Sequence, residues 1–270
     1  MEPAFCTTPQ RLLRTDELDR ESLELFLFSD DYPCLIIEDA VDALPAGHVV
    51  RRITNSQHLS GYAVEPRFLK IGRAWFDCAT EEERAAHIAN TIRYSKETSA
   101  LCRPFPVPTD TLKLELDLIW GPGVMNQRID GRPIYYGLPR ALPPGGAVEA
   151  HFDWIGFDSP GALGIEHIQR QIAVNVHLQT AEQGGELALW DVDLSPAELM
   201  ALRLTGHPYA LDEEKLGAPT VVVKPPERSL VLFDATKPHA VRKTGGNRPR
   251  VTFSSFMGYA GADMPLTLWS

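Results

Sequence analysis

From residue 112 onward, the chain consists of short segments in which apolar and polar residues alternate. Successive side chains of a β-strand project to opposite faces, so this alternation is typical of strands that are buried on one side. Turn signals rich in glycine and proline separate the segments. Many short strands joined by turns predict a β-sandwich or barrel. The segments are LKLELDLIW (112–120), GAVEAHFDW (146–154), IAVNVHLQT (172–180), GGELALWD (184–191), PTVVVKPPERSLVLFD (219–234) and RVTFSSFMGY (250–259).

The first hundred residues show a mixed pattern with helical stretches. Thr80 is followed three residues later by Glu83 and then by an apolar face, which is the capping-box signature of a helix start. Three prolines in CRPFPVPTD (102–110) interrupt any helix and mark a boundary. We therefore expect a mixed helical support region at 1–105 that packs on a β-rich core at 106–270, the two forming one structural unit.

Residues 191–219 interrupt the series of strands. Ser195 is a good N-cap, Pro196 suits the first helical position, and Glu198 completes a capping box. The pattern predicts a helical insertion between two strands, at the rim of the β-rich core. Such an insertion is either a lid over a binding site or a surface embellishment, and the sequence leaves both open.

Composition and charge narrow the classes of partner. The net charge is −10, and no cluster of lysine and arginine appears, which argues against nucleic acid as a partner. No segment has the length and apolar character of a membrane span, and the N-terminus lacks the pattern of a signal peptide. The cysteines are scattered without a CxxC pair, which indicates a reducing compartment. We therefore expect a cytoplasmic protein; the cysteines are Cys6, Cys34, Cys78 and Cys102.

Two histidines and an aspartate form a candidate metal site. His151 and Asp153 lie two apart in a predicted strand, so their side chains can share one face. That pair alone occurs often by chance. His239 adds a third ligand type at the start of a later strand, and imidazole with carboxylate suits a divalent iron. Further on, Arg250 heads a strand in which Thr252 lies on the same face, and a buried guanidinium favours a carboxylate partner.

In this order the motifs resemble the iron(II)- and 2-oxoglutarate-dependent dioxygenases. The order is HFD, then GGEL, then the SLVLFD block with its following histidine, then RVT. The likeness is greatest to the prolyl-4-hydroxylase-like branch, which includes stand-alone bacterial hydroxylases of amino-acid derivatives and related carrier-free halogenases. It covers about residues 112–260. The resemblance implies a double-stranded β-helix (jelly-roll or cupin-like) core, so we expect a mainly β fold with supporting helices.

The resemblance also implies roles for individual residues. His151, Asp153 and His239 correspond to the ligands of Fe(2+), and Arg250 to the residue that binds the distal carboxylate of 2-oxoglutarate, supported by Thr252. Arg248 lies near the same position, but the clean strand after Pro249 favours Arg250. The halogenating relatives replace the carboxylate of the HxD motif by a small residue. Because this chain keeps Asp153, the resemblance implies hydroxylation with O2 rather than halogenation.

Six further residues are candidates, Asn175 for the co-substrate and the others, His177 among them, for the substrate. Asn175 and His177 share the polar face of a strand, which either faces inward beside the co-substrate or meets solvent. Arg140 is either a ligand-binding residue or a solvated loop residue. The substrate candidates with aromatic or basic side chains are Trp154, Phe157 and Arg73.

We expect an oxygenase that hydroxylates an unactivated C–H bond of a small molecule, an amino-acid derivative or a product of secondary metabolism, and releases succinate and CO2. One alternative is a peptidyl or protein hydroxylase of the prolyl-hydroxylase type, which would have an open groove. The other is a non-catalytic, cupin-like metal-binding sensor, which would not need Arg250. The oligomeric state stays open, with a homodimer as one alternative.

Overall fold

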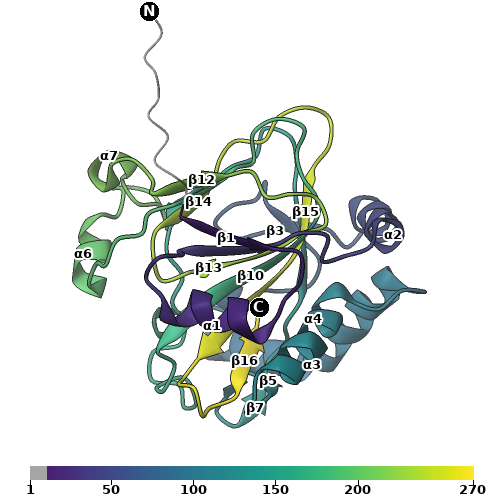
Figure 1. The fold of residues 1–270 in the computed structure, drawn as a ribbon, viewed down its shortest axis with the longest axis horizontal. Helices are drawn as coiled ribbons and strands as arrows, with labels where there is room; N and C mark the ends of the chain where they lie inside the picture. The colour runs from purple at the N-terminus through teal and green to yellow at the C-terminus, as the bar shows by residue number, and fades with distance from the viewer. Residues whose placement is uncertain (1–10) are drawn as a thin grey trace, which may run out of the picture.

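The computed structural model describes residues 11–270, and Cys6 lies outside them. Two β-sheets form the centre of the molecule, and helices pack around them (Figure 1). The large sheet has the strand order β1-β2-β13-β10-β15-β8-β4-β3, with β16 beside β15 and β5 beside β16. Its strands are β1 (Leu12–Thr15), β2 (Cys34–Ile37), β3 (Ser60–Gly61), β4 (Leu69–Lys70), β5 (Val124–Asn126), β8 (Leu138–Leu142), β10 (Arg170–Gln179), β13 (Leu230–Asp234), β15 (Arg250–Tyr259) and β16 (Leu266–Trp269).

The small sheet has the order β12-β11-β14-β9, and a separate hairpin joins β6 to β7. All neighbours within the small sheet are antiparallel. The mainly β fold with supporting helices, predicted from the sequence, is confirmed. These strands are β9 (Val148–His151), β11 (Leu187–Leu189), β12 (Val221–Val223), β14 (His239–Val241), β6 (Arg128–Ile129) and β7 (Arg132–Pro133).

Helices cover the outer face of the large sheet. Ile172, Val174 and Val176 of β10 pack in one cluster with side chains of the flanking helices, whereas Ala173 packs with residues of the small sheet. The large sheet therefore has an apolar outer face and an inner face directed toward the small sheet. The helices are α1 (Arg20–Phe28), α2 (Ala43–Thr54), α3 (Glu81–Cys102), α4 (Pro108–Ile119), α5 (Ile155–Asp158), α6 (Pro196–Ala201) and α7 (Glu213–Leu216), with a 3-10 turn at Trp75–Asp77.

The strand predicted at 112–120 is wrong, because this segment belongs to helix α4. Leucine at every second position satisfies strand alternation, but Leu112 and Leu116 are also four residues apart, which is helical spacing. These two side chains are buried, whereas Leu114 and Leu118 are 59% and 77% exposed. Pro108 at the start of the helix favours the helical alternative.

The region at 1–105 adds strands to both edges of the large sheet. β1 pairs with β2 and β2 with β13 at one edge, while β3 pairs with β4 and β4 with β8 at the other. The boundary drawn at 105/106 falls between α3 and α4. As a division into domains it stays a prediction, and the pairing favours one structural unit.

Two predicted helix starts are confirmed. Thr80 accepts a hydrogen bond from the backbone N–H of Glu83, and Ser195 does the same with Glu198 at the start of α6. Helices α6 and α7 both lie within residues 191–219, where the sequence predicts a helical insertion. Within residues 11–270, no helix has both the length and the apolar character that crossing a membrane requires.

We predict that His87 makes the fold sensitive to acid. Its imidazole is fully buried between Trp75 and Tyr94, and neither ring nitrogen has a hydrogen-bond partner. Burial, with the charge of Arg73, lowers the pKa of His87 to about 4. Below about pH 6.5 this histidine therefore binds a proton in the unfolded chain but not in the folded protein. The free energy of unfolding therefore decreases as the pH falls from about 6.5 toward 4.

His87→Phe should remove that contribution, on the order of 3 kcal/mol between pH 7 and pH 4. Urea unfolding of the wild type and the variant over this pH range measures it. The exposed His58 provides the matched control, His58→Phe, which should keep the wild-type pH dependence. An equal loss of stability in acid for His87→Phe and the wild type would contradict the assignment.

Candidate functional site

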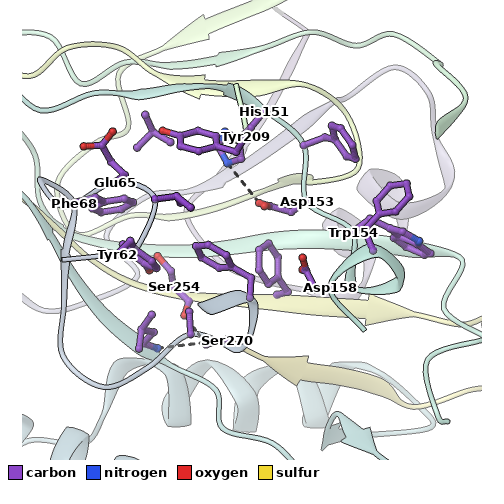
Figure 2. Close-up of a pocket in the computed structure, with 18 of the residues that line it drawn as sticks. Tyr62, Glu65, Phe68, His151, Asp153, Trp154, Asp158, Tyr209, Ser254 and Ser270 are labelled. Carbon is purple, nitrogen blue, oxygen red and sulfur yellow. Dashed lines mark hydrogen bonds and ion pairs between the residues drawn. The ribbon is translucent and has the colours of Figure 1, made fainter. Parts of the chain in front are cut away.

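His151, Asp153 and His239 meet at the inner side of the small sheet. β9 ends at His151 and β14 begins at His239, and the antiparallel pairing sets these two residues directly opposite each other. Their ring centroids are 4.2 Å apart. Asp153 follows the strand and is fixed by its backbone N–H, which donates to Ala235 at 2.8 Å. Figure 2 shows the carboxylate of Asp153 directed at His151.

Backbone carbonyls orient both imidazoles. Nδ1 of His151 lies 2.8 Å from the oxygen of Glu149, and Nδ1 of His239 lies 3.0 Å from that of Lys237. A carbonyl oxygen only accepts, so each Nδ1 carries the proton and each Nε2 has a free lone pair. The two Nε2 atoms lie 3.7 Å and 3.4 Å from Oδ2 of Asp153. Two imidazoles and one carboxylate therefore converge, with ligand atoms all within 4.8 Å of one another.

The protonation states suit a divalent cation. Burial, together with His239, lowers the pKa of His151 to about 4. Burial alone would raise the pKa of Asp153, but the neighbouring histidines and Arg140 lower it overall. A neutral imidazole and an ionised carboxylate are the forms that bind metal. This donor set, two nitrogens and one oxygen on one side, fits a non-haem iron site with open positions.

The large sheet presents a basic face to the same interior. Register pairs Arg140 of β8 with Thr252 of β15, and Thr252 with His177 of β10, so the three side chains share one face. Arg250 lies two residues before Thr252 on that face and is only 6% exposed. The polar face of β10 thus looks inward and does not meet solvent, and the roles expected for Asn175 and His177 stay predictions.

Arg250 and Arg140 lack an anionic partner. Neither makes an ion pair among the described residues, and Nε of each is buried without a hydrogen bond. Burial, with the charge of Arg140, lowers the pKa of Arg250 to about 9. Burial also lowers the pKa of His177 well below its usual value, as do both arginines. A buried guanidinium and a half-buried one, neither with a carboxylate in an ion pair, are the donor groups that an anionic ligand requires.

Hydroxyl groups extend the polar face along β15. Ser254 donates to Oδ1 of Asn175 at 2.6 Å, and its Oγ lies 3.3 Å from the Oγ1 of Thr252. Arg248, in contrast, lies at the surface and pairs with Glu227. The inward position of Arg250 and the solvent-facing position of Arg248 agree with the prediction made from the sequence.

A cavity of about 310 Å³ opens beside the metal cluster. His151, Asp153, Arg140, Trp154 and Phe157 line it, so the structure brings these predicted residues together. Arg73 is not brought to this cavity. Its guanidinium donates to the carboxylate of Glu83 and, at 2.8 Å, to the carbonyl of Asp77. Arg73 therefore already has the acidic partner that was expected from a substrate.

Sequence reasoning missed one wall of the cavity, which comes from the first eighty residues. Tyr62 and Phe68 belong to the loop between β3 and β4, and the Tyr62 ring stacks on that of Phe76 at 5.3 Å. No motif marks these residues; the aromatic side chains of this region were the only signal. Figure 2 shows Tyr62, Glu65 and Phe68 together at one end of the cavity.

Three more lining residues were missed, two of them in the insertion. Arg203 and Tyr209 come from 191–219, and the Tyr209 ring packs on the edge of His151 at 5.6 Å. Asp158 ends α5 and faces the cavity as well. Burial, reinforced by the charge of Asp153, raises the pKa of Asp158 to about 7.

One protein family and one curated protein are similar to this chain in sequence. The family model described as "Carrier-protein-independent halogenase WelO5" matches residues 130–270. L-gamma-glutamyl-L-propargylglycine hydroxylase of Streptantibioticus cattleyicolor is 27% identical over 217 residues, which are 78% of this chain and 72% of that protein.

Solved structures show the same fold. Crystal structures of an N-substituted L-amino acid dioxygenase from Burkholderia ambifaria AMMD, one of them in complex with alpha-KG, superpose with TM-scores of 0.60 and 0.59. Each covers 93% of this chain and 91% of that chain at 15% identity. The two-sheet core is therefore shared with these structures.

We predict that His239→Ala lowers the affinity for a divalent cation more than about 100-fold, since changing even an outer partner of a metal ligand costs about 10- to 100-fold. Calorimetric titration of the metal-free protein with Fe(2+), under anaerobic conditions, measures the change. His58→Ala, at an exposed position, is the control and should bind as the wild type does. Unchanged affinity in His239→Ala would exclude the cluster as the metal site.

Proposed function

The chain belongs to the carrier-protein-independent halogenase WelO5 family, and we propose that within it this protein is an iron(II)- and 2-oxoglutarate-dependent hydroxylase of a small molecule. The co-substrates are 2-oxoglutarate and O2, and the products are succinate, CO2 and a hydroxylated substrate. One observation carries this proposal: a His-Asp-His cluster lies in the same interior as Arg250, which is buried, and Arg140, and neither arginine makes an ion pair among the described residues.

Each part of the interior has a role in this proposal. His151, Asp153 and His239 hold the iron, which when bound supplies the oxidising chemistry. Arg250 binds the distal carboxylate of 2-oxoglutarate through its fork of N–H donors, a geometry that lysine does not reproduce. Thr252 and Asn175 support that carboxylate from the same inner face.

The protein's own contribution is orientation and exclusion of water. The carbonyls of Glu149 and Lys237 hold the two imidazoles in one tautomer, so that no rearrangement is needed when the metal binds. The aromatic wall contributed by the β3–β4 loop keeps the cavity apolar beside the cluster. His177, buried and held neutral by its surroundings, accompanies the arginines without adding another positive charge.

Asp153 favours hydroxylation over halogenation. A halogenating site needs a coordination position for chloride, which a small residue in place of the carboxylate would leave free. Here the carboxylate is present and faces both imidazoles. The hydroxylase from Streptantibioticus cattleyicolor supports the same outcome, because it is a relative named for oxygenation.

The substrate class is an amino-acid derivative or a related secondary metabolite. One relative is named for a γ-glutamyl amino acid, and the structures of like fold are named for N-substituted amino acids. The cavity is bordered both by the β3–β4 loop and by the 191–219 insertion, which suits a small molecule better than an extended peptide. For the same reason we propose that the insertion acts as a lid.

The cysteines and the net charge bear on the cellular setting. Cys34, Cys78 and Cys102 are free and buried, which supports a reducing compartment such as the cytoplasm. The net charge of −10 supports a small-molecule partner rather than nucleic acid.

The visible charge-transfer band of iron(II) chelated by 2-oxoglutarate tests the function. Anaerobic addition of both to the protein should produce this band, and its titration gives the affinity for 2-oxoglutarate. Arg250→Met should weaken that affinity at least about 30-fold, because a charged group of the ligand loses its buried partner. Arg248→Met, two residues away at the surface, is the matched control. Absence of a band in the wild type would refute the function. An unchanged affinity of Arg250→Met for 2-oxoglutarate would show that another residue binds its distal carboxylate.

We predict that Asp153→Gly abolishes hydroxylation, since one of three ligands is lost, and opens a position for chloride. Mass spectrometry of products formed with 2-oxoglutarate, O2 and chloride distinguishes oxygenated from chlorinated product. The wild type should give only the oxygenated product in the same chloride concentration. Hydroxylation at the full rate by Asp153→Gly would show that the carboxylate is not a ligand.

A further inference from the structure

Asp158 faces the cavity but belongs to neither the metal cluster nor the basic face. Among the described residues, its carboxylate makes no ion pair and no side-chain hydrogen bond; the contact with Arg84 is through the Asp158 backbone carbonyl. Figure 2 shows the carboxylate of Asp158 directed into the cavity, on the side of Trp154. Arg84 and Arg203 act on this carboxylate electrostatically, but neither forms an ion pair with it, so a cationic group of a ligand can bind it directly.

Arg203 lines the same cavity from the insertion. Its guanidinium lies over the ring of Phe152, 5.6 Å from the centroid, and Nη1 donates to the carbonyl of Pro208 at 2.9 Å. Nε is buried and has no hydrogen-bond partner, and no carboxylate in residues 11–270 forms an ion pair with Arg203. The guanidinium thus keeps unused donor capacity at the cavity wall.

The two side chains have opposite charges. Burial and the charge of Asp153 raise the pKa of Asp158, whereas Arg84 and then Arg203 lower it. No ion pair joins Asp158 and Arg203, although both line one cavity. Opposite charges that face a common space without touching fit a ligand that carries both charges itself. A zwitterion would then satisfy the carboxylate and the guanidinium at once.

We propose that Asp158 binds the ammonium group and Arg203 the carboxylate of a zwitterionic amino-acid substrate. This inference rests on the proposed function and specifies how the substrate is recognised. It also separates two carboxylate sites: Arg250 on β15 takes the co-substrate, and Arg203 in the insertion takes the substrate. The insertion is then a part of the substrate site.

Glu65 is the rival carboxylate for the ammonium group. It lines the cavity from the β3–β4 loop, at the opposite end from Asp158 in Figure 2. The aromatic side chains of Tyr62 and Phe68 surround that end, which suits the apolar part of a substrate. Asp158, in contrast, is a carboxylate whose pKa burial raises and Arg203 lowers. Glu65→Gln is therefore the sharpest control.

Binding of blocked and unblocked ligands tests the proposal without turnover. The probes are the standard L-α-amino acids and their γ-L-glutamyl derivatives, each also as the N-acetyl form and as the α-carboxamide. Calorimetry uses the full chain with Zn(2+) in place of iron and with 2-oxoglutarate present. The wild type should prefer the unblocked form of its best ligand over either blocked form by about 10- to 100-fold, the effect of a charged hydrogen bond.

Each variant should lose one preference only. Asp158→Asn should bind the free and N-acetyl forms alike and still discriminate against the carboxamide; Arg203→Gln should show the reverse. Glu65→Gln and the exposed Asp263→Asn should keep both preferences. Circular dichroism and thermal unfolding establish that all variants are folded.

Three results would overturn the proposal: binding of no probe by the wild type, wild-type preferences in Asp158→Asn and Arg203→Gln, or loss of the ammonium preference in Glu65→Gln. The function is tested separately by the charge-transfer band. A band without these preferences would leave the hydroxylase standing and reject the zwitterion site. If the wild type showed both preferences but no charge-transfer band, the zwitterion site would stand and the hydroxylase function would be rejected.

Discussion

The pairing of β9 with β14 is the contact on which the rest of the site depends. It sets His151 opposite His239, and a slip of one residue would turn one imidazole to the other face of the sheet. Asp153 adds a second constraint, because its backbone N–H is fixed by Ala235, the residue that follows β13 of the large sheet. Both sheets thus position the three side chains that we assign to the metal. Their geometry therefore depends on how one sheet packs on the other.

On the side that faces this cluster, the large sheet carries positively charged side chains that make no ion pair within residues 11–270. Burying Arg250 without a carboxylate costs folding free energy, and the low pKa of Arg250 reflects that cost. The 2-oxoglutarate dianion that we propose for this site would offset the cost and stabilise the folded state through binding. The outer face of β10 packs against helices, so the sheet can hold this charge without losing its core. The same strand therefore supports the fold on one side and a ligand site on the other.

The sequence predicted positions in the central strands better than positions in loops and in one helix. Strand alternation predicted the β-rich core and placed Arg250 on an inner face, because in a strand position along the chain determines direction. The same alternation failed at 112–120, where leucines two and four apart satisfy both periods and Pro108 selects the helix. The residues of the cavity wall could not be predicted from the sequence, for another reason. Tyr62 and Arg203 lie in loops, and only the packing of distant segments brings them together.

This difference has a functional counterpart. The residues that we assign to the metal and the co-substrate lie on or beside strands. The residues that we assign to the substrate, Asp158 and Arg203, lie on a short helix and in an insertion, outside those strands. Loops tolerate change that strands do not, so one core can carry many substrate sites. In the function that we propose, the strands therefore hold the groups common to the reaction, while Asp153 favours hydroxylation and the loop residues select the substrate.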